Sequence, residues 1–237
     1  MRFPSPLRRG RLVQRYKRFF ADVRLDDGAL VTAHCPNPGA MLGLGDPGLP
    51  VWVSTSADPK RRLATTLELV EADLGRGPCL VGINTAHPNR LVAEAIAEAR
   101  IAELAGYPEL RREVRYGVAS RVDLLLKCAR RGLCYVEVKN VHLMREAGRA
   151  EFPDCRTERG AKHLAELAAM VAAGHRAVMV YLVQREDAET FSLAADLDPA
   201  YAAAFAQARQ AGVEALAYRC RITPEEVALD MPVPITT

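Results

Sequence analysis

Alternating hydrophobic and polar positions in the second half of the chain predict two adjacent strands. In residues 120–127 and 133–141, valine and leucine recur at every second position between polar side chains. The connection between these strands, residues 129–132, is short enough for a hairpin. Side chains two residues apart on a strand share a face, so Glu137 and Lys139 are expected to project together.

The predicted hairpin places two acids and a lysine close together, because Asp123 lies opposite Glu137 if the register aligns. Carboxylates on adjacent strands can bind Mg²⁺ or Mn²⁺, with the backbone carbonyl of Val138 as a third ligand. Such an ion polarises a phosphate and lowers the pKa of bound water, while Lys139 orients the water or offsets developing charge. The alternative is a solvated Glu137 and Lys139 pair, which contributes no more than about 1 kcal/mol.

The N-terminal part of the chain is divided by turn-forming residues into short β-prone runs. Such strands and loops favour a small barrel, most economically an OB-fold, over residues 1–84. In the first strand Phe19, Ala21, Val23 and Leu25 are expected to fill the barrel. The predicted strands cover residues 11–25, 29–34, 50–55, 63–73 and 79–84.

The remaining residues, 85–237, predict a second domain of α/β type. An Ala, Glu and Leu-rich segment, capped by Asn89 and ended by Gly106, predicts one helix. Helix, three strands, helix and strand is an order found in many metal-dependent nucleases. The further predictions are strands near 112–117, 120–127, 133–141, 176–183 and 213–219, and helices near 158–173 and from Pro199 to Gly212.

Composition is ordinary for a globular protein, with 49% hydrophobic and 26% charged residues among 237. No apolar run approaches the length of about 20 residues that spans a bilayer, and the N-terminus lacks a signal sequence. The six cysteines show no zinc-binding spacing. We therefore expect a cytoplasmic protein with reduced thiols and no membrane partner.

Basic residues are concentrated before the first acidic residue, Asp22, although the net charge is only +3. Such a stretch attracts polyanions, or it is a solvated basic surface. Aromatic side chains there can stack on bases, worth about 1 to 3 kcal/mol each, or can pack against the second domain. The predicted nucleic-acid-binding residues are Arg15, Tyr16, Lys17, Arg18 and Phe20 on the first strand, Lys60, Arg61 and Arg62 on a turn, and Lys162 and His163 on a helix.

Two of these expectations have explicit alternatives. Lys162 and His163 lie where they can reach a phosphate or the metal site, but Lys162 can also form an exposed pair with Glu166. Glu94, on the first helix, can add a carboxylate to the metal site or simply be solvated.

Several longer segments of the chain form distinctive motifs. They are Arg15-Tyr-Lys-Arg-Phe, His34-Cys-Pro-Asn-Pro-Gly-Ala-Met41, Gly82-Ile-Asn-Thr85, Pro88-Asn89, Ser120-Arg-Val-Asp123, Tyr135-Val-Glu-Val-Lys139, Phe152-Pro-Asp154, Thr157-Glu-Arg-Gly160 and Lys162-His-Leu164. Together they resemble the sugar fermentation stimulation protein A family of bacteria and archaea over nearly the whole chain. The resemblance implies an OB-fold followed by a PD-(D/E)xK nuclease-like domain, with the nuclease acids and lysine at Asp123, Glu137 and Lys139. It also implies DNA binding without marked sequence preference and a regulatory role in maltose utilisation.

The chain departs from the family pattern at Cys155, Arg156 and His142, none of which is a predicted ligand. Three functions stay open from the sequence: a Mg²⁺- or Mn²⁺-dependent nuclease, a non-catalytic DNA-binding regulator, and a sugar-responsive interaction protein. Single-stranded and double-stranded DNA are both candidate partners, as is RNA. A dimer is compatible with the sequence, which does not determine the oligomeric state.

Overall fold

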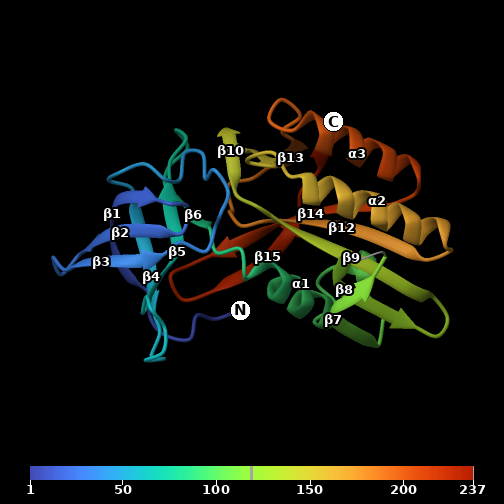
Figure 1. Ribbon diagram of the computed structural model, residues 1–237, viewed down its shortest axis with the longest axis horizontal. Helices are drawn as coiled ribbons and strands as arrows, with labels where there is room; N and C mark the ends of the chain where they lie inside the picture. Colours follow the sequence, from blue (N-terminus) through green and yellow to red (C-terminus); the bar gives the residue numbers. More distant parts are fainter. Residues whose placement is uncertain (118–119, 237) are drawn as a thin grey trace.

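The N-terminal strands form a closed barrel in the computed structural model, which describes residues 1–117 and 120–236 (Figure 1). The sheet order is β3-β2-β1-β4-β5-β6, and β3 also pairs with β5, which closes a five-stranded ring. The predicted OB-fold is therefore confirmed. The strands are β1 (Arg8–Tyr16), β2 (Phe20–Leu25), β3 (Leu30–His34), β4 (Pro50–Thr55), β5 (Thr65–Ala72) and β6 (Cys79–Gly82).

The strand predicted over residues 11–25 is in fact a hairpin. Its turn contains Lys17 and Arg18, whose φ angles of 48° and 62° lie in the left-handed region. Phe19 follows this turn and is 47% exposed, so the prediction that it fills the barrel is wrong. The strand predicted over residues 79–84 is present as β6, but it pairs with β5 outside the closed ring and is not one of the five barrel strands.

The second domain is built on a six-stranded sheet in the order β15-β14-β12-β9-β8-β7, which confirms the predicted α/β class. Helix α1 covers one face, and α2 with α3 covers the other (Figure 1). The elements are α1 (Pro88–Ala97), β7 (Glu109–Tyr116), β8 (Ser120–Cys128), β9 (Gly132–Val141), α2 (Glu158–Ala172), β12 (Arg176–Val183), α3 (Pro199–Gln210), β14 (Glu214–Ile222) and β15 (Val227–Pro232).

Two regions differ from the sequence-based prediction. The helix expected over residues 89–105 begins at Pro88 and ends at Ala97, where Ala99 turns the chain with a φ of 54° before a short 3-10 turn over Ala102–Leu104. Asn89 is therefore inside the helix and does not cap it. A small sheet was not predicted; it consists of β10 (Leu143–Glu146), β11 (Arg149–Phe152), β13 (Thr190–Leu193) and β16 (Ile235–Thr236). Among the described residues, no helix is long and apolar enough to cross a membrane.

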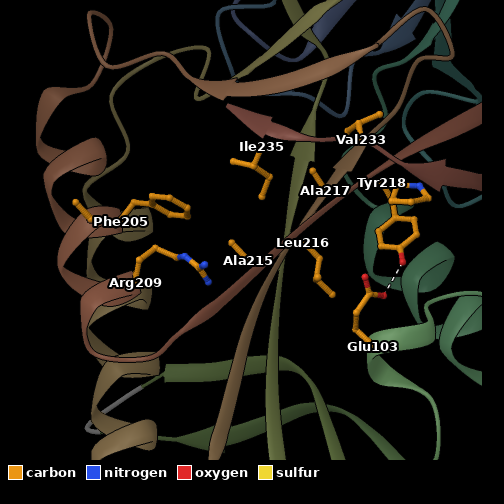
Figure 2. Close-up of a pocket in the computed structure, with 11 residues that line it drawn as sticks. Glu103, Phe205, Arg209, Ala215, Leu216, Ala217, Tyr218, Val233 and Ile235 are labelled. Atoms are coloured by element: carbon orange, nitrogen blue, oxygen red, sulfur yellow. Dashed lines mark hydrogen bonds between the residues drawn. The ribbon is translucent and has the colours of Figure 1, made fainter. Parts of the chain in front are cut away.

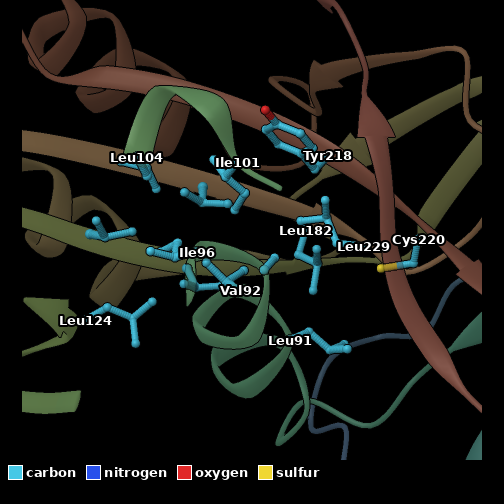
Figure 3. Close-up of a cluster of buried hydrophobic side chains, with 14 of the residues drawn as sticks. Leu91, Val92, Ile96, Ile101, Leu104, Leu124, Leu182, Tyr218, Cys220 and Leu229 are labelled. Carbon is cyan, nitrogen blue, oxygen red and sulfur yellow. The ribbon is translucent and has the colours of Figure 1, made fainter. Parts of the chain in front are cut away.

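The main core lies between α1 and the sheet of the second domain (Figure 3). Leu91, Val92 and Ile96 project from α1 toward Leu124 and Leu182 of the strands. Burial of such side chains provides roughly 1.5 to 3 kcal/mol each. This packing fixes α1 against β8 and β9.

Direct contacts also join the two domains. The amino group of Met1 donates to the carbonyl of Val227 at 2.8 Å, so the first residues, predicted to belong to the barrel domain, pair with β15. On the other side, the Asp154 carboxylate accepts the backbone N–H of Met41 at 3.0 Å and lies 3.2 Å from His142 Nε2. The loop before β4 is thereby fixed to the second domain.

Replacing a fully buried leucine tests the core. Leu182→Ala should lower the free energy of unfolding by roughly 2 to 5 kcal/mol, because Leu182 is 0% exposed and its loss leaves a cavity. Leu30→Ala, at a leucine that is 59% exposed, should change it by no more than about 0.5 kcal/mol. Urea denaturation measures both, and equal effects would contradict the described core.

The Asp154 contact predicts a pH dependence. Burial alone would raise the pKa of Asp154, but the hydrogen bond and charge of His142, with the Met41 N–H, hold it well below the usual 3.8. The ionised carboxylate therefore adds stability above pH 3.8, and this is lost as the pH falls further. Asp154→Asn should be less stable than the parent by about 1 to 3 kcal/mol at neutral pH.

Urea denaturation of both proteins at a series of pH values measures this difference. It should shrink as the pH falls below 3.8. A difference that stays constant across the acid range would show that the Asp154 charge does not contribute.

Candidate metal centre

Asp123 and Glu137 meet where strands β8 and β9 separate. The antiparallel pairing runs as far as Leu124 opposite Val136, one residue before the two acids. Beyond that point the Asp123 side chain replaces a strand partner, since its Oδ2 accepts the backbone N–H of Val138 at 2.8 Å. The separation of the strands thus leaves room for a carboxylate site at the edge of the ladder.

Asn89 of α1 holds the other oxygen of Asp123. Its Nδ2 donates to Asp123 Oδ1 at 2.7 Å. The pattern of the chain predicts Asn89 as a helix cap, and no local signal marks its contact with an acid 34 residues away. Asn89 is therefore a positioning residue that sequence reasoning missed.

Glu137 is almost completely buried, with 2% of its surface exposed. Its Oε1 accepts from Lys139 Nζ at 2.9 Å and also contacts His163 Nδ1. Its Oε2 is buried without a hydrogen-bond partner among the described residues. A buried carboxylate oxygen left without a donor costs free energy, and a cation removes that cost.

The two acids differ in their titration. Burial raises the pKa of Asp123, and the nearby charge of Glu137 raises it further. For Glu137, burial acts in the same direction, but the hydrogen bond and charge of His163 and Lys139 outweigh it and lower its pKa. The site therefore holds one firmly ionised carboxylate beside one whose charge is disfavoured, and a bound cation would offset their mutual repulsion.

These residues fit a divalent cation that keeps part of its water shell. In residues 1–117 and 120–236 no three His, Cys, Asp or Glu side chains are grouped to hold a metal. The protein would therefore supply Asp123, Glu137 and the Val138 carbonyl, with water or phosphate as the remaining ligands. Mg²⁺ is typically held in this way, by one or two carboxylates together with substrate phosphates.

Glu94 does not join these acids. Its carboxylate lies 3.2 Å from the amino group of Met1 and 2.7 Å from Arg90 Nε. The structure therefore gives Glu94 a role in fixing the N-terminus to α1. A different acid, Glu113, lies closer to Asp123 than Glu94 does. Asn89 Nδ2, which donates to Asp123, is also 3.4 Å from Glu113 Oε1.

Glu113 lies in β7 at a point where the pairing with β8 is interrupted without a change of register. The pairing with β8 skips from Arg112 to Val114, and Glu113 has a φ of 55°. A non-glycine residue in this conformation stores strain, which proteins retain mainly near functional sites. The skipped position is directly opposite Asp123, and no sequence pattern signals it.

Helix α2 brings His163 to the site, whereas Lys162 faces elsewhere. Thr157 caps the helix, as expected, by accepting the N–H of Gly160 at 3.1 Å. Lys162 Nζ lies 3.8 Å from Glu166, which matches the alternative of an i,i+4 pair. Arg159, which was not predicted as a site residue, places its Nε 3.3 Å from His163 Nε2.

The basic and aromatic candidates on the barrel divide into three groups. Tyr16 and Phe20 stack on each other, with ring centroids 5.4 Å apart and planes 15° apart. Arg15 turns inward and donates to loop carbonyls, including those of Asn37 and Gly39 at 2.8 Å. Lys17, Arg18, Lys60, Arg61 and Arg62 are exposed. Nucleic-acid binding by all of these residues stays a prediction.

A pocket of about 540 Å³ lies elsewhere in the second domain, between α3 and the outer edge of β14 (Figure 2). Its wall is formed mainly by apolar side chains such as Phe205, Leu216 and Ile235, with Tyr218 bonded to Glu103 at 2.6 Å. Asp123, Glu137 and Lys139 do not line this pocket.

Comparison with known proteins accounts for most of the chain. Residues 13–83 match the family model described as the SfsA N-terminal OB domain, and residues 86–226 match the one described as the sugar fermentation stimulation protein RE domain. The chain belongs to the sugar fermentation stimulation protein family. Homologues of this protein from Rhodospirillum centenum and Azorhizobium caulinodans are 63% and 60% identical, with 97% and 99% of both chains covered.

The fold is also similar to a solved member of the family, Pyrococcus furiosus SfsA in complex with Ca²⁺. The TM-score is 0.87 and the identity 26%, and the match covers 100% of this chain and 98% of the other. A divalent cation is thus bound by a protein of the same family and architecture.

Metal binding can be tested directly on Asp123. Isothermal titration with Mn²⁺ should show binding to the parent protein and at least about tenfold weaker binding to Asp123→Asn, because the substitution removes a ligand charge. Asp27→Asn provides a matched control, since Asp27 lies on the barrel in an exposed pair with Arg8. Equal affinities in all three proteins would show that Asp123 is not a ligand.

Proposed function

We propose that this chain is a divalent-metal-dependent nuclease that binds nucleic acid without sequence preference. The observation that carries the proposal is the meeting of Asp123 and Glu137 beside Lys139, with a buried Glu137 oxygen that no donor in residues 1–117 and 120–236 reaches. Mg²⁺ or Mn²⁺ is the expected ion. The six free cysteines agree with the expected cytoplasmic location, where thiols stay reduced.

The residues of the site suggest separate roles. A bound divalent ion supplies Lewis-acid activation of phosphate and of water. Glu137 and Asp123 hold that ion, and Asn89 fixes the Asp123 carboxylate. Lys139, whose Nζ lies 3.4 Å from His163 Nδ1, provides the positive charge that offsets charge developing on the phosphate. His163 in turn fixes the orientation of Glu137.

The barrel is proposed to hold the nucleic acid during cleavage. DNA is the expected partner, single- or double-stranded, and RNA offers the same phosphates and bases. The exposed basic side chains track the backbone, and the Tyr16 and Phe20 rings offer a stacking surface. Binding of this type weakens steeply with salt.

A second candidate is a non-catalytic DNA-binding regulator of sugar metabolism, maltose utilisation in particular. The names of the relatives, sugar fermentation stimulation protein homologues, favour it. So does the involvement of Lys139 and His163 in holding Glu137 Oε1, which is compatible with a purely structural site. The two candidates differ in whether the protein cleaves the nucleic acid that it binds.

Cleavage assays separate these candidates. With Mn²⁺ or Mg²⁺, the parent protein should cut DNA, and Lys139→Ala should cut at least about 100-fold more slowly, because it lacks the charge beside the phosphate. Lys127→Ala is the matched control, since Lys127 lies on β8 at the opposite end from Asp123 and is exposed. It should leave the rate unchanged.

The substrates should include single-stranded, duplex and branched DNA, and RNA. Absence of metal-dependent cleavage of all of them by the parent protein would exclude the nuclease and leave the regulator. Equal rates for the parent and Lys139→Ala would exclude the role given to Lys139.

A further inference from the structure

A second cavity, of about 440 Å³, lies at the boundary between the barrel and the second domain. Its wall is formed by the N-terminal segment, strands β3 to β5 and the first turn of α1. Its lining residues include Arg2, Phe3, His34, Arg61, Glu68 and Arg90. We call this cavity the junction pocket.

The acid at the base of the junction pocket is internally satisfied. Both oxygens of Glu68 accept hydrogen bonds, from Ser54 Oγ at 2.7 Å on one side and from Asn84 Nδ2 at 2.8 Å on the other, where His87 Nε2 also lies at 2.9 Å. A carboxylate bonded in this way has little remaining capacity to bind a ligand cation. The side chains at the rim therefore determine which charge the pocket attracts.

The rim of the junction pocket carries three arginines. Arg2 has 86% of its side chain exposed and lies 3.8 Å from Glu226, a weak pair. Arg61 donates to the neutral Thr66 hydroxyl at 3.0 Å, and Arg90 pairs with Glu94 while remaining 55% exposed. Guanidinium groups in this arrangement favour phosphate, to which they can donate two parallel hydrogen bonds.

The pocket continues the aromatic surface of the barrel. Phe20, which stacks on Tyr16, pairs directly with His34 across β2 and β3, so the three rings lie in one row on the outer face. His34 also belongs to the wall of the junction pocket, together with its partner in β5, Thr66. A nucleic-acid strand whose bases stack on this row of rings would therefore continue into the junction pocket.

Helix α1 links the junction pocket to the metal centre. Arg90 lines the pocket, while its neighbour Asn89 holds Asp123 at 2.7 Å. A chain of hydrogen bonds also connects the pocket wall with strand β9. Gln184 Nε2 donates to Asn140 Oδ1 at 2.7 Å and to the carbonyl of Asn84 at 3.4 Å. Asn84 lies in the wall of the pocket, and Asn140 follows Lys139 in β9.

We propose that the junction pocket is a nucleotide subsite, which takes one unpaired nucleotide of a single strand passing from the aromatic row to the metal centre. Its phosphate lies among Arg2, Arg61 and Arg90. A volume of about 440 Å³ is that of a site for one small molecule and excludes a duplex. The inference rests on the proposed function, because it specifies single-stranded nucleic acid as the substrate.

Binding measured without metal tests the subsite independently of cleavage. Fluorescence anisotropy in a chelator should show that the full chain binds an oligothymidylate of about 12 nucleotides, an OB-fold site size, at least about tenfold more tightly than a duplex of equal length. The double variant Arg2→Ala/Arg61→Ala should weaken single-strand binding at least about tenfold and reduce the slope of log affinity against log salt by about 1.4. Its duplex binding should weaken less than its single-strand binding, because a duplex cannot place a phosphate inside the pocket.

Arg149→Ala is the matched control, since Arg149 is an exposed, paired arginine of β11 far along the chain from the pocket. It should leave single-strand binding unchanged. Unaltered single-strand binding by the double variant, or an equal loss in Arg149→Ala, would overturn the subsite. Equal affinity of the parent protein for strand and duplex would overturn the single-strand assignment.

Free thymidine monophosphate distinguishes a strand from a separate nucleotide ligand, and it uses the parent protein alone. It should displace the labelled oligonucleotide only at concentrations far above those of the strand, because it occupies one subsite of several. Displacement by thymidine monophosphate at the same concentration as the oligonucleotide would overturn the proposed path of a single strand through the pocket. A protein that binds as predicted but never cleaves would contradict the nuclease and leave the subsite intact.

Discussion

The parallel pairing of β9 with β12 determines the properties of the candidate site. The register is continuous from Cys134 opposite Arg176 to Val141 opposite Val183, so Glu137 and Lys139 are carried on a central strand. A central position buries the carboxylate of Glu137, and burial makes its charge costly unless cations lie beside it. Lys139 and His163 meet part of that requirement. Glu137 Oε2 has no hydrogen-bond partner in the described part of the chain, so the requirement is not met completely.

The same constraint explains the position of Asp123. Because β12 pairs with β9 on one side, β8 is the neighbour on the other, and its ladder stops at Leu124. The amide of Val138 then needs an acceptor, which Asp123 supplies. Asp123 therefore has two roles: it completes the carboxylate site, and it accepts the backbone N–H of Val138 where β8 and β9 separate.

Local patterns predicted the parts of the fold whose burial is periodic. Strands β8 and β9 and helix α2 follow directly from alternation or from a helical stripe, and so did the proximity of Asp123 to Glu137. The turn at Lys17 and Arg18 could not be predicted, because neither residue favours the left-handed conformation that it adopts. Glu94 was assigned wrongly for a different reason, since its partner is the amino group of Met1, far away in sequence.

Arg15 shows how charge and shape become linked in this molecule. Its guanidinium donates to the carbonyls of Asn37 and Gly39, in the loop whose Met41 amide reaches Asp154 of the second domain. Arg15 thus braces the loop that contacts the second domain, although its own hydrogen bonds stay within the barrel. Replacing Arg15 would therefore change two things at once, a positive charge on the barrel and the anchoring of the loop that joins the domains.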